Sequence, residues 1–427
     1  MAAPEKIFCQ AFADSVLQVG SLKNCIQYAL THQTSVKQSL LDEEITDREI
    51  KSKLADWYPQ LNLNFSFQHN SELPTSIIQG NPVKFGLNNT SSAQFSISQT
   101  IFNRDVLLAS STSDEVRKRS QELTIKNKID VVVGVSKAFY SVLLTNAQIK
   151  LLDEDILRLQ KSLNDAYSQY KSGIVDKIDY KRASIALNNA TAEQKQNAEL
   201  LKSREAYLKE VMGYPASANL KLMYDTTRME NETAADTNQA VNFSNRIEYQ
   251  IFETQKQLLE SNLHYYEWSF IPSLTAFGYY NFNYMNNDFQ KLYERNYPSS
   301  YLGLQLSLPI FEGGKRLQEI SRAKLELERA EYDLTALRNS LNTEFVQALS
   351  DYKSNLNTYR VMKENLALAR DVFSTVELQY KSGIKTYLEV ITAETDLRTT
   401  EFNFFDSLYR VLSSKLDLQK ALGEIKY

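Results

Sequence analysis

Helix-breaking residues are scarce in this chain of 427 residues, which has only 12 Gly and 8 Pro. Average proteins use about 7% glycine and 5% proline, so the chain has fewer turn-forming residues than a set of ordinary compact domains needs. An excess of charge is also absent, since 48 Lys and Arg stand against 52 Asp and Glu and the formal net charge is −4. We therefore expect no nucleic acid as a partner.

Residues with metal-binding or catalytic chemistry are few as well. Cys9 and Cys25 form no CxxC or other ligand spacing, and His32, His69 and His264 lie far apart. The chain contains no HExxH, P-loop or GxSxG motif. The sequence therefore predicts that the protein is not an enzyme and needs no cofactor or metal.

Long hydrophobic runs are missing too. Because no run of about 18 apolar residues occurs, we expect no membrane-spanning helix, and a membrane role would have to use strands. Residues 1–20 form an N-terminal segment in which Ala11, Phe12 and Ala13 match an A-x-A cleavage site. A truncated export signal and a chance match both stay open for this segment.

An internal repeat organises the chain. The pentapeptide Tyr170–Ile174 recurs letter for letter as Tyr380–Ile384, an offset of 380 − 170 = 210 residues, and the same offset carries Gly213 onto Gly423. The predicted divisions are repeat 1 at 21–215, a polar linker at 216–239 and repeat 2 at 240–427.

Each repeat is predicted to contain a long helix and a returning helix. The apolar residues before each pentapeptide follow the spacing of a coiled-coil seam, with Leu152, Leu159 and Ala166 in the first and Leu366, Phe373 and Tyr380 in the second. Each seam ends near a glycine, Gly173 or Gly383, which suits a left-handed helix cap. We expect long helices at about 105–170 and 315–380, and returning helices at about 178–212 and 386–422.

Strands are predicted ahead of each long helix, because the apolar period changes there from seven residues to two. Leu61, Leu63 and Phe65 alternate with polar residues, as do Leu302 and Leu304. The strand pairs fall at about 60–101 and 273–310. Aromatic residues near these strands are typical of a membrane-interface girdle, namely Trp57, Tyr58, Trp268, Tyr279, Tyr280 and Tyr284.

Two surroundings compete for the apolar face of these strands. Helices could cover it in a soluble sheet, or it could contact lipid while the polar face lines water; strand length and aromatics favour lipid. Four strands cannot close a barrel, and open edges in hydrocarbon leave backbone groups unpaired, so several copies must combine. Two copies would supply eight strands and three copies twelve, and the residues alone leave this choice open.

Several motifs then carry a family resemblance. They are Ser21–Leu30 as a first helix, Ile271–Leu274 opening a strand, Leu308–Arg316 joining strand to helix, and Tyr380–Val390 at the second turn. With the order of elements over residues 21–423, they resemble the TolC family of bacterial outer-membrane efflux proteins. The resemblance implies a mixed α and β fold in which antiparallel helical hairpins form a coiled-coil α-barrel. This α-barrel continues a transmembrane β-barrel with four strands per chain, and a homotrimer completes both.

The same resemblance implies a passive duct across the outer membrane and periplasm of a Gram-negative bacterium. It would export drugs, other small molecules or proteins in a tripartite efflux or type I secretion system. The implied partners are a periplasmic adaptor, an inner-membrane RND or ABC pump and outer-membrane lipid. A soluble coiled-coil scaffold or a periplasmic adaptor is the alternative, which the heptads allow and the alternating strands oppose.

Site residues follow from the resemblance position by position. A periplasmic gate would use Asp179, Tyr380 and Lys385. Of the two acidic positions of the family's constriction, Glu389 matches one while Thr392 replaces the other, so we expect only weak cation preference. The turns at Gly173, Ile174, Gly383 and Ile384 would dock the adaptor.

Overall fold

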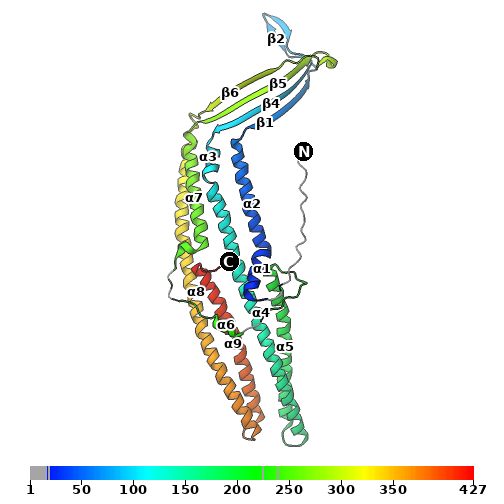
Figure 1. Cartoon of the computed structure of the whole chain (residues 1–427), viewed down its shortest axis with the longest axis vertical. Coiled ribbons are helices and arrows are strands. Elements are labelled where there is room, and N and C mark those ends of the chain that lie inside the picture. The colour runs from blue at the N-terminus through cyan, green and yellow to red at the C-terminus, as the bar shows by residue number, and fades with distance from the viewer. Residues whose placement is uncertain (1–16, 18–19, 224–225, 238, 240) are drawn as a thin grey trace. The chain divides into compact units, whose positions relative to one another are not determined.

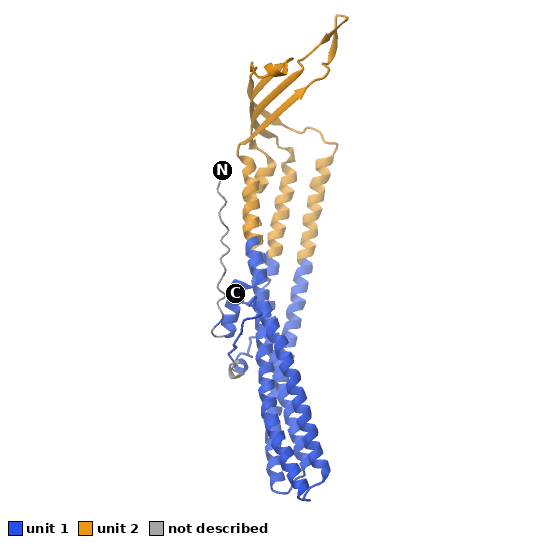
Figure 2. Ribbon diagram, turned by 90° about the vertical axis from the view of Figure 1, so that its right-hand side faces the viewer, with its two compact units in different colours: residues 1–41, 122–250, 335–427 blue, residues 42–121, 251–334 orange. Residues whose placement is uncertain are grey.

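The computed structural model describes residues 17, 20–223, 226–237, 239 and 241–427 (Figure 1). The predicted cleavage site and Cys9 lie outside the described residues. Two compact units divide the chain, one of residues 1–41, 122–250 and 335–427 and the other of residues 42–121 and 251–334 (Figure 2). We call them the helical unit and the sheet unit.

Helices and strands are both present, as predicted, and helices dominate. The α-helices are α1 (Leu22–His32), α2 (Thr34–Leu54), α3 (Arg104–Ser111), α4 (Ser113–Lys171), α5 (Lys177–Met212), α6 (Thr226–Asn231), α7 (Ile247–Glu267), α8 (Lys315–Lys381) and α9 (Tyr387–Leu422). Short 3₁₀ turns are η1 (Ala55–Trp57), η2 (Phe243–Asn245), η3 (Trp268–Phe270) and η4 (Phe289–Lys291). The strands are β1 (Gln60–His69), β2 (Thr75–Ile78), β3 (Asn81–Lys84), β4 (Asn89–Phe102), β5 (Ser273–Asn286) and β6 (Ser299–Ser307).

The sheet unit contains a four-stranded antiparallel sheet in the order β1-β4-β5-β6. The two strand pairs predicted from the two repeats therefore join through β4 and β5. The register places Leu63 of β1 opposite Phe95 of β4, and Phe95 opposite Tyr280 of β5. Because side chains alternate between faces, this row belongs to one apolar face of the sheet.

Among the described residues, nothing covers that apolar face. Leu63, Phe65, Leu302, Leu304 and Leu306 are 58–87% exposed. Polar residues such as Asn62, Asn64, Ser96 and Gln305 occupy the opposite face. Neither face is therefore packed on a helix layer as the sheet of a soluble α and β domain would be.

A core of interlocking heptads fills the helical unit. Leu152, Leu159 and Ala166 of α4 are buried at intervals of seven residues. Four buried residues of α9 have the same interval, namely Leu397, Phe404, Val411 and Leu418. Their partners on α8 include Tyr352, Tyr359 and Leu366. This is the coiled-coil packing that the sequence spacing predicts.

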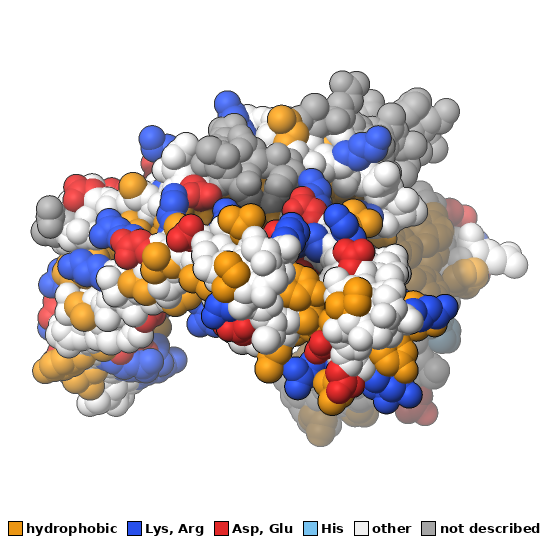
Figure 3. Space-filling view, turned by 90° about the horizontal axis from the view of Figure 1, so that it is seen from below, with side chains coloured by type: hydrophobic (Ala, Val, Ile, Leu, Met, Phe, Trp, Pro, Cys, Tyr) orange, Lys and Arg blue, Asp and Glu red, His pale blue; other side chains and the backbone are white. Residues whose placement is uncertain are grey.

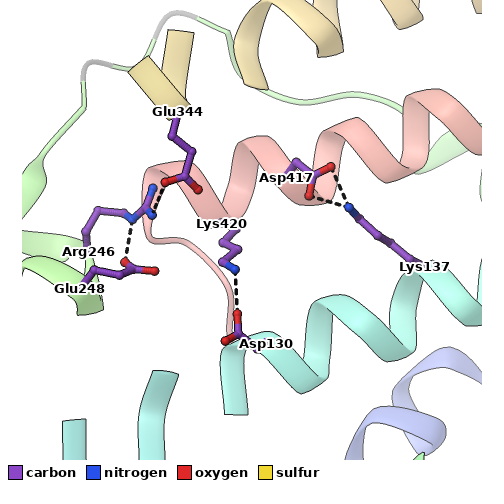
Figure 4. A network of polar contacts seen from close by, with 7 residues as sticks. All are labelled: Asp130, Lys137, Arg246, Glu248, Glu344, Asp417 and Lys420. Carbon is purple, nitrogen blue, oxygen red and sulfur yellow. Dashed lines mark hydrogen bonds and ion pairs between the residues drawn. The ribbon is translucent and has the colours of Figure 1, made fainter. Parts of the chain in front are cut away.

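Ion pairs fasten the C-terminal part of α9. Figure 4 shows Lys420 beside Asp130, Lys137 beside Asp417, and Arg246 between Glu248 and Glu344. Arg246 is only 2% exposed and also donates to the Ala421 carbonyl oxygen at 3.0 Å. This guanidinium joins the start of α7, the end of α9 and α8 within the helical unit.

Two features differ from the sequence prediction. The first long helix is interrupted at Thr112, between α3 and α4. The hydroxyls of Ser111 and Thr112 both donate to the Leu108 carbonyl oxygen, an alternative that competes with regular helix geometry. In addition, β2 and β3 form a two-stranded sheet between β1 and β4, which the strand periodicity did not predict.

One described helix is apolar enough in part to cross a membrane, contrary to our expectation. Helix α4 contains an 18-residue stretch with a mean hydropathy of 1.3, of which 67% is buried. Consecutive core residues, including Val135, Phe139, Val142 and Leu143, lie in this helix. We interpret the apolar stretch as the core of the helical unit.

Helix-ending glycines of the repeat allow a test of these packing arguments. Gly423 has φ 75°, and a Cβ there would lie 2.7 Å from the Asn245 carbonyl oxygen. We predict that Gly423→Ala lowers the free energy of unfolding by more than about 1 kcal/mol, because it adds left-handed strain to a clash. Helical Gly134 has open space, so Gly134→Ala should instead stabilise by about 0.5–1 kcal/mol. Thermal unfolding of both variants beside the wild type measures this; equal effects would contradict it.

Candidate functional site

The two turns of the repeat have the same geometry. Gly173 has φ 72° and Gly383 has φ 78°. The amides of Ile174 and Ile384 donate back to the carbonyl oxygens of Gln169 and Gln379 at 3.0 and 2.9 Å. These are Schellman caps, and they leave Ile174 and Ile384 more than 70% exposed, at 73% and 72%. Each turn thus presents one apolar side chain.

The helices that leave the turns begin differently. The Asp176 side chain accepts from the Ile178 amide at 3.1 Å at the start of α5. At the start of α9, Glu389 reaches back and accepts from the Thr386 amide and hydroxyl at 2.8 and 3.0 Å. Both caps satisfy amides that the first helical turn leaves free.

Lys385 and Glu389 form an ion pair within the second turn. The Lys385 ammonium donates to the Glu389 carboxylate at 2.5 Å. Lys385, together with the Thr386 contacts, lowers the pKa of the Glu389 carboxyl to about 2. Glu389 is therefore ionised at neutral pH, but its charge is largely balanced by Lys385. Thr392, one turn further, is exposed, and its hydroxyl donates to the Leu388 carbonyl oxygen at 2.9 Å.

Tyr380 connects the two hairpins. Its hydroxyl donates to the Gln169 side chain of α4 at 3.4 Å, and its ring lies 5.7 Å from that of Tyr387. Burial raises the pKa of Tyr380 above its usual range, and Asp179 adds to this effect. Of the three predicted gate residues, Tyr380 is therefore affected by the charge of Asp179. Lys385 forms its ion pair with Glu389 and not with Asp179.

Charges of both signs surround these turns. In the view from below (Figure 3), acidic, basic and hydrophobic side chains are interspersed on the surface, with no field of a single sign. Such a surface suits binding of a partner through specific side-chain contacts better than long-range attraction of an oppositely charged partner.

A buried group of carboxylates that sequence reasoning missed lies between the hairpins. Asp155, Glu394 and Glu401 are 1%, 6% and 5% exposed. Arg158 pairs with Asp155 and lies 3.7 Å from Glu394, and Arg370 pairs with Glu401 at 3.1 Å. Heptad spacing gave the only available signal, since Glu394, Leu397 and Glu401 fall on the buried side of α9.

Burial shifts the titration of these acids. It raises the pKa of the Glu394 carboxyl to about 7; Asp155 adds to the rise, while Arg158 and Arg398 oppose it. Burial likewise raises the pKa of Asp155 and of Glu401. These three carboxyl groups therefore take up protons at a higher pH than ordinary carboxyl groups do.

The predicted girdle aromatics occupy different positions on the sheet unit. Trp57, Tyr58 and Trp268 precede β1 and β5, at one end of the sheet. Tyr284 lies at the other end of β5, and Tyr280 shares the apolar face with it. Tyr279 lies on the opposite, polar face, where its ring contacts Tyr301 at 4.0 Å. Because side chains alternate between faces along a strand, Tyr279 does not share a face with Tyr280 and Tyr284.

Comparison with known proteins gives one family and several distant relatives. The family model described as outer membrane efflux protein matches residues 25–214 and 267–424. Outer membrane protein TolC of Vibrio cholerae is 20% identical over 78% of this chain and 77% of its own length. The probable efflux pump outer membrane protein TtgC of Pseudomonas putida is 22% identical over 99% of this chain and 86% of its own.

A solved structure has the same fold. A crystal structure of CusC, from work on folding and transmembrane channel formation, superposes with a TM-score of 0.77 at 18% identity. The match covers 94% of this chain and 91% of that one. Fold and length therefore agree although few residues are shared.

The buried carboxylates predict a pH effect. The Glu394 pKa of about 7 lies above the value of about 4.3 expected in the unfolded chain, so the folded state binds the proton more tightly. Stability should therefore fall as pH rises from about 4.3 to 7, by about 4 kcal/mol at most. Amide exchange of α9 should be slower at pH 5.5 than at pH 8 after correction for intrinsic rates.

Glu394→Gln should remove most of this difference and protect α9 at pH 8. Asp396→Asn, on the exposed side of the same helix, is the matched control and should leave the pH dependence unchanged. An unaltered pH dependence in Glu394→Gln would exclude Glu394 as its source.

Proposed function

Because the chain belongs to the outer membrane efflux protein family and is thus an outer-membrane channel, we propose that it is the passive exit duct of a tripartite efflux or type I secretion system. One observation carries this proposal. The sheet of the sheet unit has an apolar face that no described residue covers, opposite a polar face. Such a sheet suits lipid on one side and water on the other.

Backbone hydrogen bonding argues for several copies. Strands β1 and β6 each pair on one side only, so each has a row of backbone groups without strand partners. In hydrocarbon each such group costs several kcal/mol, which only closure of the sheet avoids. Three copies would supply twelve strands, in line with the family resemblance.

Helix α8 supports the same assembly. Beside the stripe buried within the chain, it exposes a second apolar stripe with Val346, Val361, Leu368 and Leu378, which are 42–66% exposed. Val361 and Leu368 are seven residues apart, as in a coiled-coil seam. A neighbouring copy would cover this second stripe.

The gate is proposed to lie at the repeat turns. Tyr380 links α8 to α4 through Gln169, and Lys385 can exchange its partner Glu389 for Asp179, for which the described part of the chain records no ion pair. The exposed Ile174 and Ile384 would contact the periplasmic adaptor, which couples the duct to an RND or ABC pump. Docking would then separate the hairpins.

Ion selectivity at the constriction is proposed to be weak. Glu389 is ionised but already paired with Lys385, and Thr392 adds no charge. A ring of balanced charges attracts cations less than a ring of free carboxylates. The interface girdle is proposed for Trp57, Tyr58, Trp268, Tyr280 and Tyr284, and Tyr279 would face the lumen.

The assembly itself tests the proposed function. We expect detergent-purified protein to have a mass of three 49.0 kDa chains by native mass spectrometry and to form conducting pores in a planar bilayer. Apolar strand faces should make it aggregate when detergent is removed. A monomer that stays dissolved without detergent would instead indicate a soluble scaffold.

The gate gives a second test. Tyr380→Phe combined with Lys385→Ala removes the link to Gln169 and the ion pair of the second turn. We expect single-channel conductance to rise about twofold or more, because fewer contacts hold the hairpins together. Lys381→Ala, at a neighbouring exposed lysine that pairs only within α8, should leave conductance unchanged. Equal conductance in all three proteins would rule out this gate.

A further inference from the structure

A second polar site lies in the sheet unit, at the junction of strands and helices. A cavity of about 410 Å³ is lined by the ends of β5 and β6 and by residues of α3, α7 and α8. Its volume falls within the range of about 300–1,000 Å³ that small-molecule sites occupy. It is far along the chain from the repeat turns and has no part in the gate.

The cavity lies on the polar side of the sheet. Ser273 and Ser307, which pair in the register of β5 and β6, both line it. Alternation puts them on the face of Thr275 and Gln305, opposite the exposed leucines. A ligand would therefore reach the cavity from water and not from lipid.

Ser269 provides the first sign of a ligand. It is 7% exposed and lines the cavity, and its hydroxyl has no hydrogen-bond partner among the described residues. A buried polar group without a partner is unfavourable, because it has lost its hydrogen bonds to water. Such a cost is offset if a bound molecule accepts the hydrogen bond.

Arg104 provides the positive charge. Its guanidinium lies 4.4 Å from the centroid of the Tyr265 ring, and the described chain records no ion pair for it. Tyr265 is held in turn by a 2.6 Å hydrogen bond from its hydroxyl to Asp105. The stacked ring fixes the guanidinium beside the cavity while its N–H groups remain available to a ligand.

Neighbouring acids do not cancel this charge, because they have partners of their own. Glu312 pairs with Arg316 at 2.9 Å, and Glu319 lies 3.8 Å from Lys315. Helix α8 begins at Lys315, so the positive end of its dipole also lies at the cavity. Among the residues that line the cavity, Arg104 is therefore the cation that a negative ligand group would contact, because the described chain records no ion pair for it.

We propose that this cavity binds the oxyanion of a small organic solute, a carboxylate or a phosphate ester, through the Arg104 guanidinium and the Ser269 hydroxyl. The guanidinium offers two parallel N–H donors to such a group, and the hydroxyl donates a third hydrogen bond. Tyr265 and Tyr266, whose rings lie 5.4 Å apart, would contact the organic body of the solute. In the proposed duct, three such sites would retain anionic permeants briefly below the barrel; the binding itself does not require conduction.

Equilibrium titration tests this site. Detergent-purified protein should bind phenyl phosphate and benzoate saturably by isothermal titration calorimetry, and should bind benzyl alcohol, which has no charge, far more weakly. Arg104→Gln keeps a polar side chain, shorter and without the charge, and should weaken binding of both anions by about tenfold or more. Ser269→Ala should weaken it by about threefold to tenfold.

The matched control is Arg295→Ala. Arg295 also lies over a tyrosine, 5.1 Å from the Tyr297 ring, but in the loop at the other end of β5 and β6, so binding should not change. Circular dichroism and oligomer mass confirm that each variant is folded, and Arg104→Lys should recover part of the affinity. No saturable binding by the wild type, or equal binding by Arg104→Gln, would overturn the proposal. Bilayer conductance is measured separately, so a conducting protein that binds no anion refutes only this site.

Discussion

The need to pair every backbone amide and carbonyl of the sheet constrains the rest of the molecule. One chain supplies four neighbouring strands with a bare apolar face and two edges without strand partners. In water the apolar face would aggregate, and in lipid the edges would be unsatisfied. The proposed closure of the sheet by several copies within a bilayer would resolve this conflict. The exposed apolar stripe of α8 fits the same proposal, because a neighbouring copy would cover it.

Sequence periodicity predicted the elements well because local geometry controls them. The seven-residue seam predicted for α4 is buried, and the seam predicted for α8 is buried at Leu366 and half-buried at Phe373 and Tyr380. The two-residue alternation of β1 and β6 gives the two faces. The break at Thr112 and the small sheet of β2 and β3 escaped prediction because hydroxyl competition and loop pairing leave no periodic signal.

Site residues were harder to predict because they depend on partners distant in sequence. Lys385 and Glu389 are an exception, since they lie only four residues apart and the resemblance assigned them to different roles. In the sequence, Glu394 resembles an ordinary charged residue of a helix. The structure shows that Asp155 and Arg158 of α4 affect its charge. Ser269 and Arg104 lie 165 residues apart (269 − 104 = 165), and only the register of β4 and β5 brings their surroundings together.

The small departures from symmetry between the repeats have physical consequences. Both turns share the pentapeptide and the Schellman cap, so their backbones are equivalent. Their helix starts differ, since Asp176 caps α5 alone whereas Glu389 caps α9 and also holds Lys385. The second turn therefore pairs its own opposite charges, while Asp179 of the first turn has no ion pair in the described chain. Under the proposed gate, a contact between Lys385 and Asp179 would require Lys385 to leave Glu389, so the charges that rearrange would be those of the second hairpin.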